Sequence, residues 1–268
     1  MNFHCALFVF GDSMQKITSL SNPRIKFLKT LKSKKGRVQS NSFLLEGKRA
    51  CLDALNHGVE FECVLVTEDF ITCDFDCEII ETTKEVIMAL SSCDAPEGII
   101  AQVKMLDNGF CTQKLAGDLI VFIDRLQDAG NLGTIIRTCD AAGVSNIVLS
   151  PETVELYNPK TVRATMSSLF SVNVMVAKDS INALNEIKKS GYSLVAATLN
   201  GKDFYKNSFI GKKCLIIGNE GNGICDEILA ISDQRVTLPM REHGAESLNA
   251  SVAAGILIYG LTFERIGE

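Results

Sequence analysis

The sequence lacks several features that would point to common classes of protein. No apolar run is long enough to cross a lipid bilayer, so we expect no contact with the membrane interior. Its three histidines, His4, His57 and His243, and its 10 cysteines, none in a CxxC pair, offer no recognisable metal site. The wide spacing of the cysteines favours free thiols in a reducing cytoplasm. A histidine-based triad and a carboxylate cluster are also missing, which argues against a hydrolase.

The length of 268 residues is enough for two domains, and the content of 46% hydrophobic and 22% charged residues is typical of a globular protein. No basic residue precedes the apolar stretch at 5–10, so we expect a disordered tail at 1–13 rather than a secretory signal. Hydrophobic periodicity fades around residue 107. We therefore predict a first domain at 14–105, a linker at 106–117 and a second domain at 118–268.

Charge is distributed very unevenly along the chain. The net charge is −5, yet the segment 16–49 carries +9 and leaves −14 for the rest. Such a segment on an acidic protein favours binding of a polyanion such as RNA, although a solvated helix face would carry the same charges. The expected phosphate contacts are Arg24, Lys26, Lys32, Lys34, Lys35 and Arg37.

The order of apolar segments predicts an α/β protein. In the first half, a basic helix at 23–35 precedes strands at 43–47, 63–67 and 99–104 and helices at 49–57 and 83–90. In the second half, six apolar runs, several of them rich in Val and Ile, predict buried parallel strands: 119–123, 146–149, 172–176, 194–198, 214–217 and 235–238. Helices are expected at 132–142, 180–189 and 248–265, the last with Leu248, Val252, Ile256, Tyr259 and Phe263 facing the core.

Polar and glycine-rich segments follow three of these strands, where open α/β sheets bind ligands. The first segment, Asp124–Arg137, leads into a helix on which Arg137 projects away from the apolar face. Arg137 is suited to binding a phosphate or a substrate oxygen, and pairing with Asp128 or Asp140 is the alternative.

The other two segments lie near the C-terminus. The glycines at 218–223 follow a GxxGxG pattern with no Walker lysine, so they fit neither a dinucleotide fingerprint nor a P-loop. They would let backbone groups approach a flat ligand, with Glu220 as an acceptor, or they form a plain turn. Ser247 is a candidate N-cap of the last helix, whereas Asn249, within its first turn, is harder to explain by packing.

Taken together, three motifs resemble those of SpoU-type RNA 2′-O-ribose methyltransferases of the SPOUT superfamily. They are Asn131–Arg137, Gly218–Gly221, and Pro239-Met240 with Ser247–Asn249. The segments 21–26 and 43–47 are similar to the substrate-binding domain of many such enzymes, which has a fold like small ribosomal RNA-binding proteins. The resemblance covers about residues 16–266.

The resemblance implies a second domain with a deep trefoil knot, bound S-adenosyl-L-methionine and a homodimer that completes the active site. By analogy, the cofactor would contact Thr198, Gly218, Glu220, Leu238, Met240, Ser247, Leu248 and Asn249. Asn131 and Arg137 would face the ribose and its phosphate, which makes Arg137, Asn131, Glu220, Ser247 and Asn249 the candidate catalytic group.

One departure from the family is visible, because Ala129 stands where a proline usually follows the aspartate of the first motif. Proline would fix φ and stiffen the loop. The resemblance implies a methyltransferase acting on a ribose 2′-hydroxyl of structured RNA, with ribosomal RNA favoured. A transfer-RNA methyltransferase and a non-catalytic knotted RNA-binding protein are the alternatives, and the modified nucleotide is not encoded in any motif.

Overall fold

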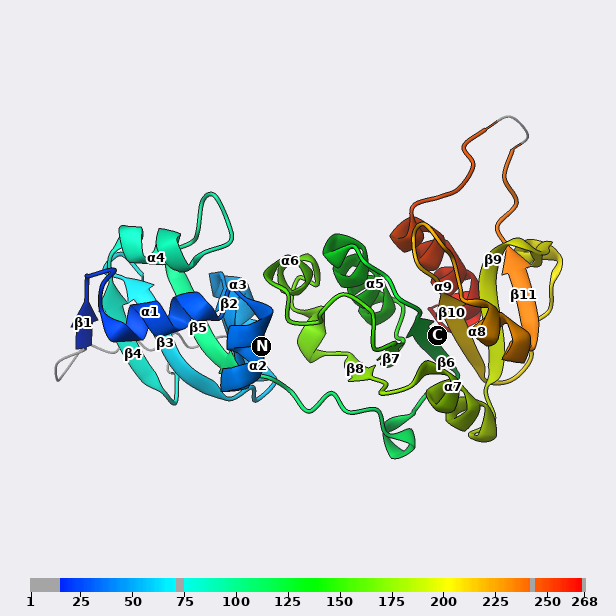
Figure 1. Ribbon diagram of the computed structural model, residues 1–268, viewed down its shortest axis with the longest axis horizontal. Helices are drawn as coiled ribbons and strands as arrows, with labels where there is room; N and C mark the ends of the chain where they lie inside the picture. The colour runs from blue at the N-terminus through cyan, green and yellow to red at the C-terminus, as the bar shows by residue number, and fades with distance from the viewer. Residues whose placement is uncertain (1–14, 71–74, 242–243, 267–268) are drawn as a thin grey trace. The chain divides into compact units, whose positions relative to one another are not determined.

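The computed structural model describes residues 15–70, 75–241 and 244–266, and divides into two compact units (Figure 1). The first comprises the chain up to Leu106 with Tyr157–Pro159, and the second comprises Asp107–Leu156 and the chain from Lys160. The tail expected at 1–13 lies outside the described residues. No helix among the described residues is long and apolar enough to span a membrane.

The first unit is built on a five-stranded mixed sheet in the order β1-β4-β3-β5-β2. Ile25, Leu28 and Leu31 from the basic segment are fully buried against strand residues such as Leu65 and Ile80. The elements of this unit are β1 (Gln15–Ile17), α1 (Pro23–Thr30), α2 (Lys34–Ser40), β2 (Ser42–Glu46), α3 (Lys48–Asn56), β3 (Phe61–Thr67), β4 (Glu78–Thr82), α4 (Lys84–Leu90) and β5 (Ile99–Lys104).

The basic segment is helical as predicted around 23–35, but a break at 31–33 divides it into two helices. Asn22 caps α1, whose last residue is Thr30, and the Ser33 side chain accepts the Gly36 N–H to begin α2. Gly36 is needed at this corner, because a Cβ there would lie 2.1 Å from the Thr30 carbonyl oxygen. The strands β1 and β4 were not predicted from the sequence.

The second unit is a six-stranded parallel sheet in the order β11-β9-β10-β6-β7-β8. All six strands predicted from apolar runs are present. Its elements are η1 (Thr112–Lys114), β6 (Leu119–Ile123), α5 (Ala129–Ala141), β7 (Asn146–Leu149), α6 (Pro159–Ala164), η2 (Ser168–Phe170), β8 (Asn173–Val176), α7 (Ser180–Lys189), β9 (Ser193–Asp203), η3 (Phe204–Lys206), β10 (Lys213–Ile217), α8 (Asp226–Ile231), β11 (Gln234–Thr237) and α9 (Ala250–Ile266).

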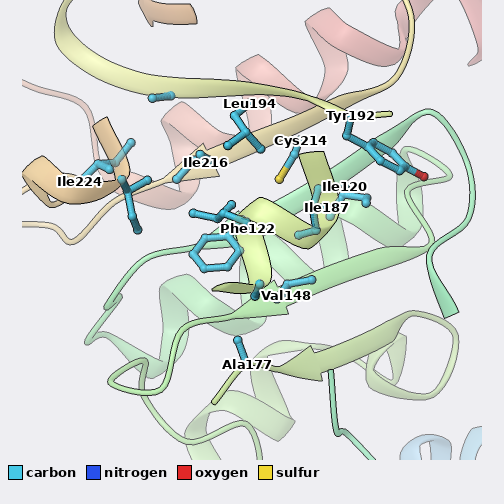
Figure 2. Close-up of a cluster of buried hydrophobic side chains, with 14 of the residues drawn as sticks. Ile120, Phe122, Val148, Ala177, Ile187, Tyr192, Leu194, Cys214, Ile216 and Ile224 are labelled. Atoms are coloured by element: carbon cyan, nitrogen blue, oxygen red, sulfur yellow. The ribbon is translucent and has the colours of Figure 1, made fainter. Parts of the chain in front are cut away.

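Alternate strand residues face opposite sides of this sheet, so it needs helices on both faces. On one face, Phe122 and Ile216 pack with Ile187 of α7 and with Ile224, which precedes α8 (Figure 2). On the other, α5 and α9 pack against each other. The sheet is therefore a buried scaffold, and polar side chains gather where its strands end.

The last helix corrects two predictions. Its buried side chains include Ala254, Leu257 and Ile258, while Val252 and Tyr259 are 51% and 41% exposed, so the core stripe was assigned to the wrong face. Asn249, not Ser247, caps the helix.

Candidate active site

The loop after β6 is fixed by an ion pair with a buried carboxylate. Asp124 is 1% exposed, and its carboxylate accepts two hydrogen bonds of 3.0 Å from the guanidinium of Arg125 and one of 3.0 Å from the Cys225 N–H. Asp124 raises the pKa of Arg125, which stays cationic. Since Cys225 follows β10, the pair ties the loop after β6 to the loop after β10.

The glycine-rich loop after β10 folds back on itself. Asn219 and Gly223 exchange two backbone hydrogen bonds of 3.0 Å, and Gly223 has a φ of +65°. A Cβ on Gly218 would lie 2.4 Å from the Gly223 carbonyl carbon, so only glycine fits there. The Asn219 side chain also donates to the Arg125 carbonyl oxygen at 2.7 Å. The loop is thus a closed turn that presents Glu220.

Glu220 binds the segment that precedes α5. Its carboxylate accepts hydrogen bonds from the Gln127 N–H (3.1 Å), the Asp128 N–H (3.0 Å) and the Asn131 side-chain amide (3.1 Å). Desolvation disfavours the charged form, but these hydrogen bonds outweigh it and lower the pKa of Glu220. An ionised Glu220 therefore holds the first motif against the second.

Asn131 extends this network to the third motif. Its side-chain oxygen accepts a hydrogen bond of 3.0 Å from the Asn249 amide, while Asn249 caps α9 through the Ser251 N–H at 2.9 Å. The fold thus brings Asn131, Glu220 and Asn249 into one chain of hydrogen bonds. Capping explains why a polar residue stands at 249.

The N-terminus of α5 is held by Asp128, which accepts the Asn131 N–H at 2.8 Å and pairs with Lys160 at 2.7 Å. Lys160, and secondarily the Asn131 N–H, lower the pKa of Asp128. Lys160 is the residue that sequence reasoning missed, because nothing in the sequence relates α6 to α5. The one hint in the sequence is Gly133. A Cβ at this position would lie 2.5 Å from the Ala164 Cβ of α6, so a glycine here indicates that another element packs closely on α5.

Arg137 lies one helical turn beyond Gly133 on α5 and is exposed. Within the part of the chain that the structure describes, its side chain makes no hydrogen bond or ion pair, so pairing with Asp128 or Asp140 is not seen. Ser247 is likewise exposed and bonds no described residue. The structure does not join these two side chains to the Asn131–Glu220–Asn249 network.

Of the residues expected to hold a cofactor, Gly218, Leu238 and Met240 follow β10 and β11, Leu248 precedes α9, and Thr198 lies within β9. Thr198 falls in a segment skipped by the pairing of β9 with β11, whose register passes from Ala196 to Lys202. Its Oγ1 is buried and has no hydrogen-bond partner, one of two such side-chain atoms among the described residues. Met240 and Leu248 are each 37% exposed. A ligand with both polar and apolar groups could pair with the Thr198 hydroxyl and cover the Met240 and Leu248 side chains.

The six candidate RNA-binding residues of the first unit separate into two groups. Arg37 is 3% exposed and donates to the Leu31 carbonyl at 2.8 Å, so its assignment to a phosphate contact is corrected to a structural role. Lys32 donates to the Ser91 carbonyl at 2.7 Å, and Arg24 pairs with Glu78 at 3.7 Å. Lys26, Lys34 and Lys35 are exposed, without a partner among the described residues.

The described residues contain no group of three His, Cys, Asp or Glu side chains arranged to hold a metal. Eight cysteines are described, and all are free thiols.

Comparison with known proteins matches both parts of the chain. Residues 118–259 match the SpoU rRNA Methylase family, and residues 22–101 match the MRM3-like substrate binding domain. The 23S rRNA (guanosine(2553)-2′-O)-methyltransferase RlmP of Bacillus subtilis is 33% identical over 252 residues, which cover 92% of this chain and 99% of the relative. The tRNA (guanosine(18)-2′-O)-methyltransferase of Aquifex aeolicus is 33% identical over 55% of this chain and 70% of the relative.

Among solved structures, the AdoMet-bound rRNA methyltransferase from Sinorhizobium meliloti superposes with a TM-score of 0.85. It is 29% identical, and the match covers 94% of this chain and 98% of that one. The likeness therefore extends through both units.

Proposed function

Since the chain belongs to the SpoU rRNA methylase family, we propose that it transfers a methyl group from S-adenosyl-L-methionine to a ribose 2′-hydroxyl of ribosomal RNA. The observation that carries this proposal is the hydrogen-bonded chain from Glu220 through Asn131 to Asn249. It joins one residue from each of the three motifs at one edge of the sheet, as a shared active site requires. We also propose that the second unit contains the deep trefoil knot that the family resemblance implies.

The residues expected to hold the cofactor fit it. S-adenosyl-L-methionine supplies an electrophilic methyl group on a sulfonium when bound. Thr198 offers the buried Oγ1 that lacks a partner, and Leu238, Met240 and Leu248 offer apolar surface for a flat heterocycle. Gly218 holds the turn after β10 tightly closed. Glu220 acts by holding the loop at 127–131 and is a positioning residue in this assignment.

Arg137 is assigned to the substrate. A guanidinium stays protonated in proteins, so it is suited to binding the phosphate beside the reactive ribose and to stabilising the negative charge that develops on O2′. Its exposure and its lack of a partner among the described residues leave all five N–H donors available. Ser247, exposed beside the Asn249 cap, completes the polar edge.

A homodimer is proposed from the exposed face of α9. Val252, Ile256 and Tyr259 recur at intervals of four and three residues, so they lie on one face of the helix. Two of these side chains are more than two-fifths exposed, which is unusual for a helix whose other side packs on α5. A second copy of the chain would cover this stripe, as the family resemblance implies.

Ribosomal RNA is favoured over transfer RNA because RlmP, named for 23S rRNA, aligns along both units, whereas the tRNA enzyme aligns over about half the chain. A ribosomal RNA substrate and the free thiols of the described cysteines support a cytoplasmic location.

The test is to incubate the purified protein with methyl-labelled S-adenosyl-L-methionine and, separately, 23S rRNA and total tRNA. We expect label in a ribose of the ribosomal RNA, protected from alkaline cleavage at that position. Label in tRNA alone would overturn the substrate assignment. RNA binding without label in either would favour the non-catalytic alternative.

A further inference from the structure

The outward face of α1 and α2 combines unpaired lysines with exposed apolar side chains. Its members, here called the α1–α2 face, are Lys26, Phe27, Lys34, Lys35 and Val38. Phe27 is 38% exposed and Val38 is 62% exposed. The chain has no acidic residue from 16 to 45, so no neighbour on these helices neutralises the lysines. A strongly basic surface with an exposed aromatic ring is suited to a ligand that is both anionic and aromatic.

The packing of α1 and α2 fixes this surface. Ile25 and Leu28 are fully buried under α1, and this turns Phe27 outward. The backbone carbonyl of Thr30, the last residue of α1, lies against Gly36 of α2. The first turn of α2, which carries Lys34 and Lys35, therefore adjoins the end of α1, three residues beyond Phe27.

Two other cations of the same segment bind backbone carbonyl groups, which separates this face from a uniformly solvated helix. Lys32 binds the carbonyl groups at the end of α4, and Arg37 is buried against the Leu31 carbonyl. Lys26, Lys34 and Lys35 are exposed and, like the half-buried Lys29, have no partner among the described residues.

We propose that the α1–α2 face binds an unpaired stretch of RNA, with Phe27 stacking on a nucleobase and Lys26, Lys34 and Lys35 contacting the flanking phosphates. This inference rests on the proposed function and narrows its substrate class. In an A-form duplex the base faces are stacked inside, and an exposed phenyl ring has nothing to stack on. A single strand or loop presents base faces and phosphates together.

The experiment measures binding of the full-length protein to a fluorescent 12-nucleotide single-stranded RNA and to a 12-base-pair duplex, at several salt concentrations. Phe27→Leu keeps an apolar side chain and removes the ring, and Phe27→Trp keeps a ring. Met88→Ala is the matched control, because Met88 is 52% exposed on α4, outside the face. Circular dichroism and thermal unfolding check that each variant is folded.

We expect Phe27→Leu to weaken single-strand binding about 5- to 20-fold, the lower part of the range for loss of one stacked base. Duplex binding and the salt dependence stay unchanged, Phe27→Trp binds as the wild type does, and Met88→Ala has no effect. Replacing Lys34 and Lys35 together by Gln makes the negative slope of log K against log salt concentration shallower by about 1.4.

Unchanged single-strand affinity in Phe27→Leu, or an equal loss for the duplex, overturns the inference. The result is independent of catalysis, because no methyl donor is present. A protein that methylates ribosomal RNA but shows no Phe27 effect contradicts this inference alone. A Phe27 effect in a protein that transfers no methyl group contradicts the proposed function alone.

Discussion

Replacing Ala129 by proline is expected to stabilise the second unit. Ala129 is the first residue of α5, directly after the N-cap Asp128. At this position the N–H has no intrahelical acceptor and φ is already close to the value that proline fixes. Asp128 has φ −81° and ψ 119°, the extended conformation that a residue before proline prefers. The substitution therefore removes no hydrogen bond within the helix and forces no backbone change.

The gain in the free energy of unfolding comes from the unfolded chain, because proline reduces its conformational entropy at residue 129. Substitutions of this kind stabilise by about 0.4–1 kcal/mol. For a unit of this size, that corresponds to a rise of about 1–4 °C in Tm. Ala129 is 7% exposed, so the ring carbons must fit beside their neighbours. Overpacking would cost about 1–3 kcal/mol and reverse the sign.

Urea unfolding followed by circular dichroism measures the change in the free energy of unfolding. Thr134→Pro is the control: it lies in the interior of the same helix, and we expect a loss of about 3 kcal/mol or more. A clear loss of stability in Ala129→Pro would refute the prediction, because either the ring carbons overpack or the backbone does not accept proline. It would mean that this chain cannot accept the proline that the family resemblance leads one to expect.

Three further predictions follow from the same contacts. The pKa values of Glu220 and Asp128 are lowered in the folded protein, so their contribution to stability is complete above the unfolded values of 4.5 and 3.8 and disappears as the pH falls through the folded ones. Urea unfolding from pH 6 to 3 should show this loss, and Glu220→Gln should reduce it; an identical pH profile would contradict the network. Arg37→Ala should destabilise by about 1–3 kcal/mol because it leaves a buried carbonyl unsatisfied, whereas Lys35→Ala should change stability by less than about 0.5 kcal/mol; equal effects in thermal unfolding would argue against the burial of Arg37. Val252→Asp should convert the proposed dimer to a monomer in sedimentation experiments, and an unchanged dimer would exclude this face of α9.

The sheet of the second unit could be predicted closely because its strands are buried on both faces. Continuous apolar runs such as 119–123 and 214–217 have few other interpretations in an α/β chain. β1, with three residues, and β4, with two of its five residues buried, carry weaker signals. The break between α1 and α2 depends on the Ser33 cap within a run of lysines, and propensity alone does not locate it.

The sequence motifs identified residues of the candidate site, but they did not predict which of these residues contact one another. Glu220 and Asn131 are 89 residues apart, and their hydrogen bond depends on the adjacency of β6 and β10. Lys160 reaches Asp128 only because α6 packs on Gly133. Charge patterning marked Arg37 and Lys35 alike, whereas burial separates them. Amphipathic periodicity identified an apolar stripe on α9 but not whether the core or a second chain covers it.

The most direct test of the account compares Arg137→Ala with the wild type in two assays. Binding of S-adenosyl-L-methionine is measured by calorimetry, and transfer of its labelled methyl group to ribosomal RNA is measured in parallel. Because Arg137 is assigned to the substrate and makes no hydrogen bond or ion pair with described residues, we predict that the variant binds the cofactor as the wild type does and transfers no methyl group. Methyl transfer retained by Arg137→Ala would contradict the proposed site.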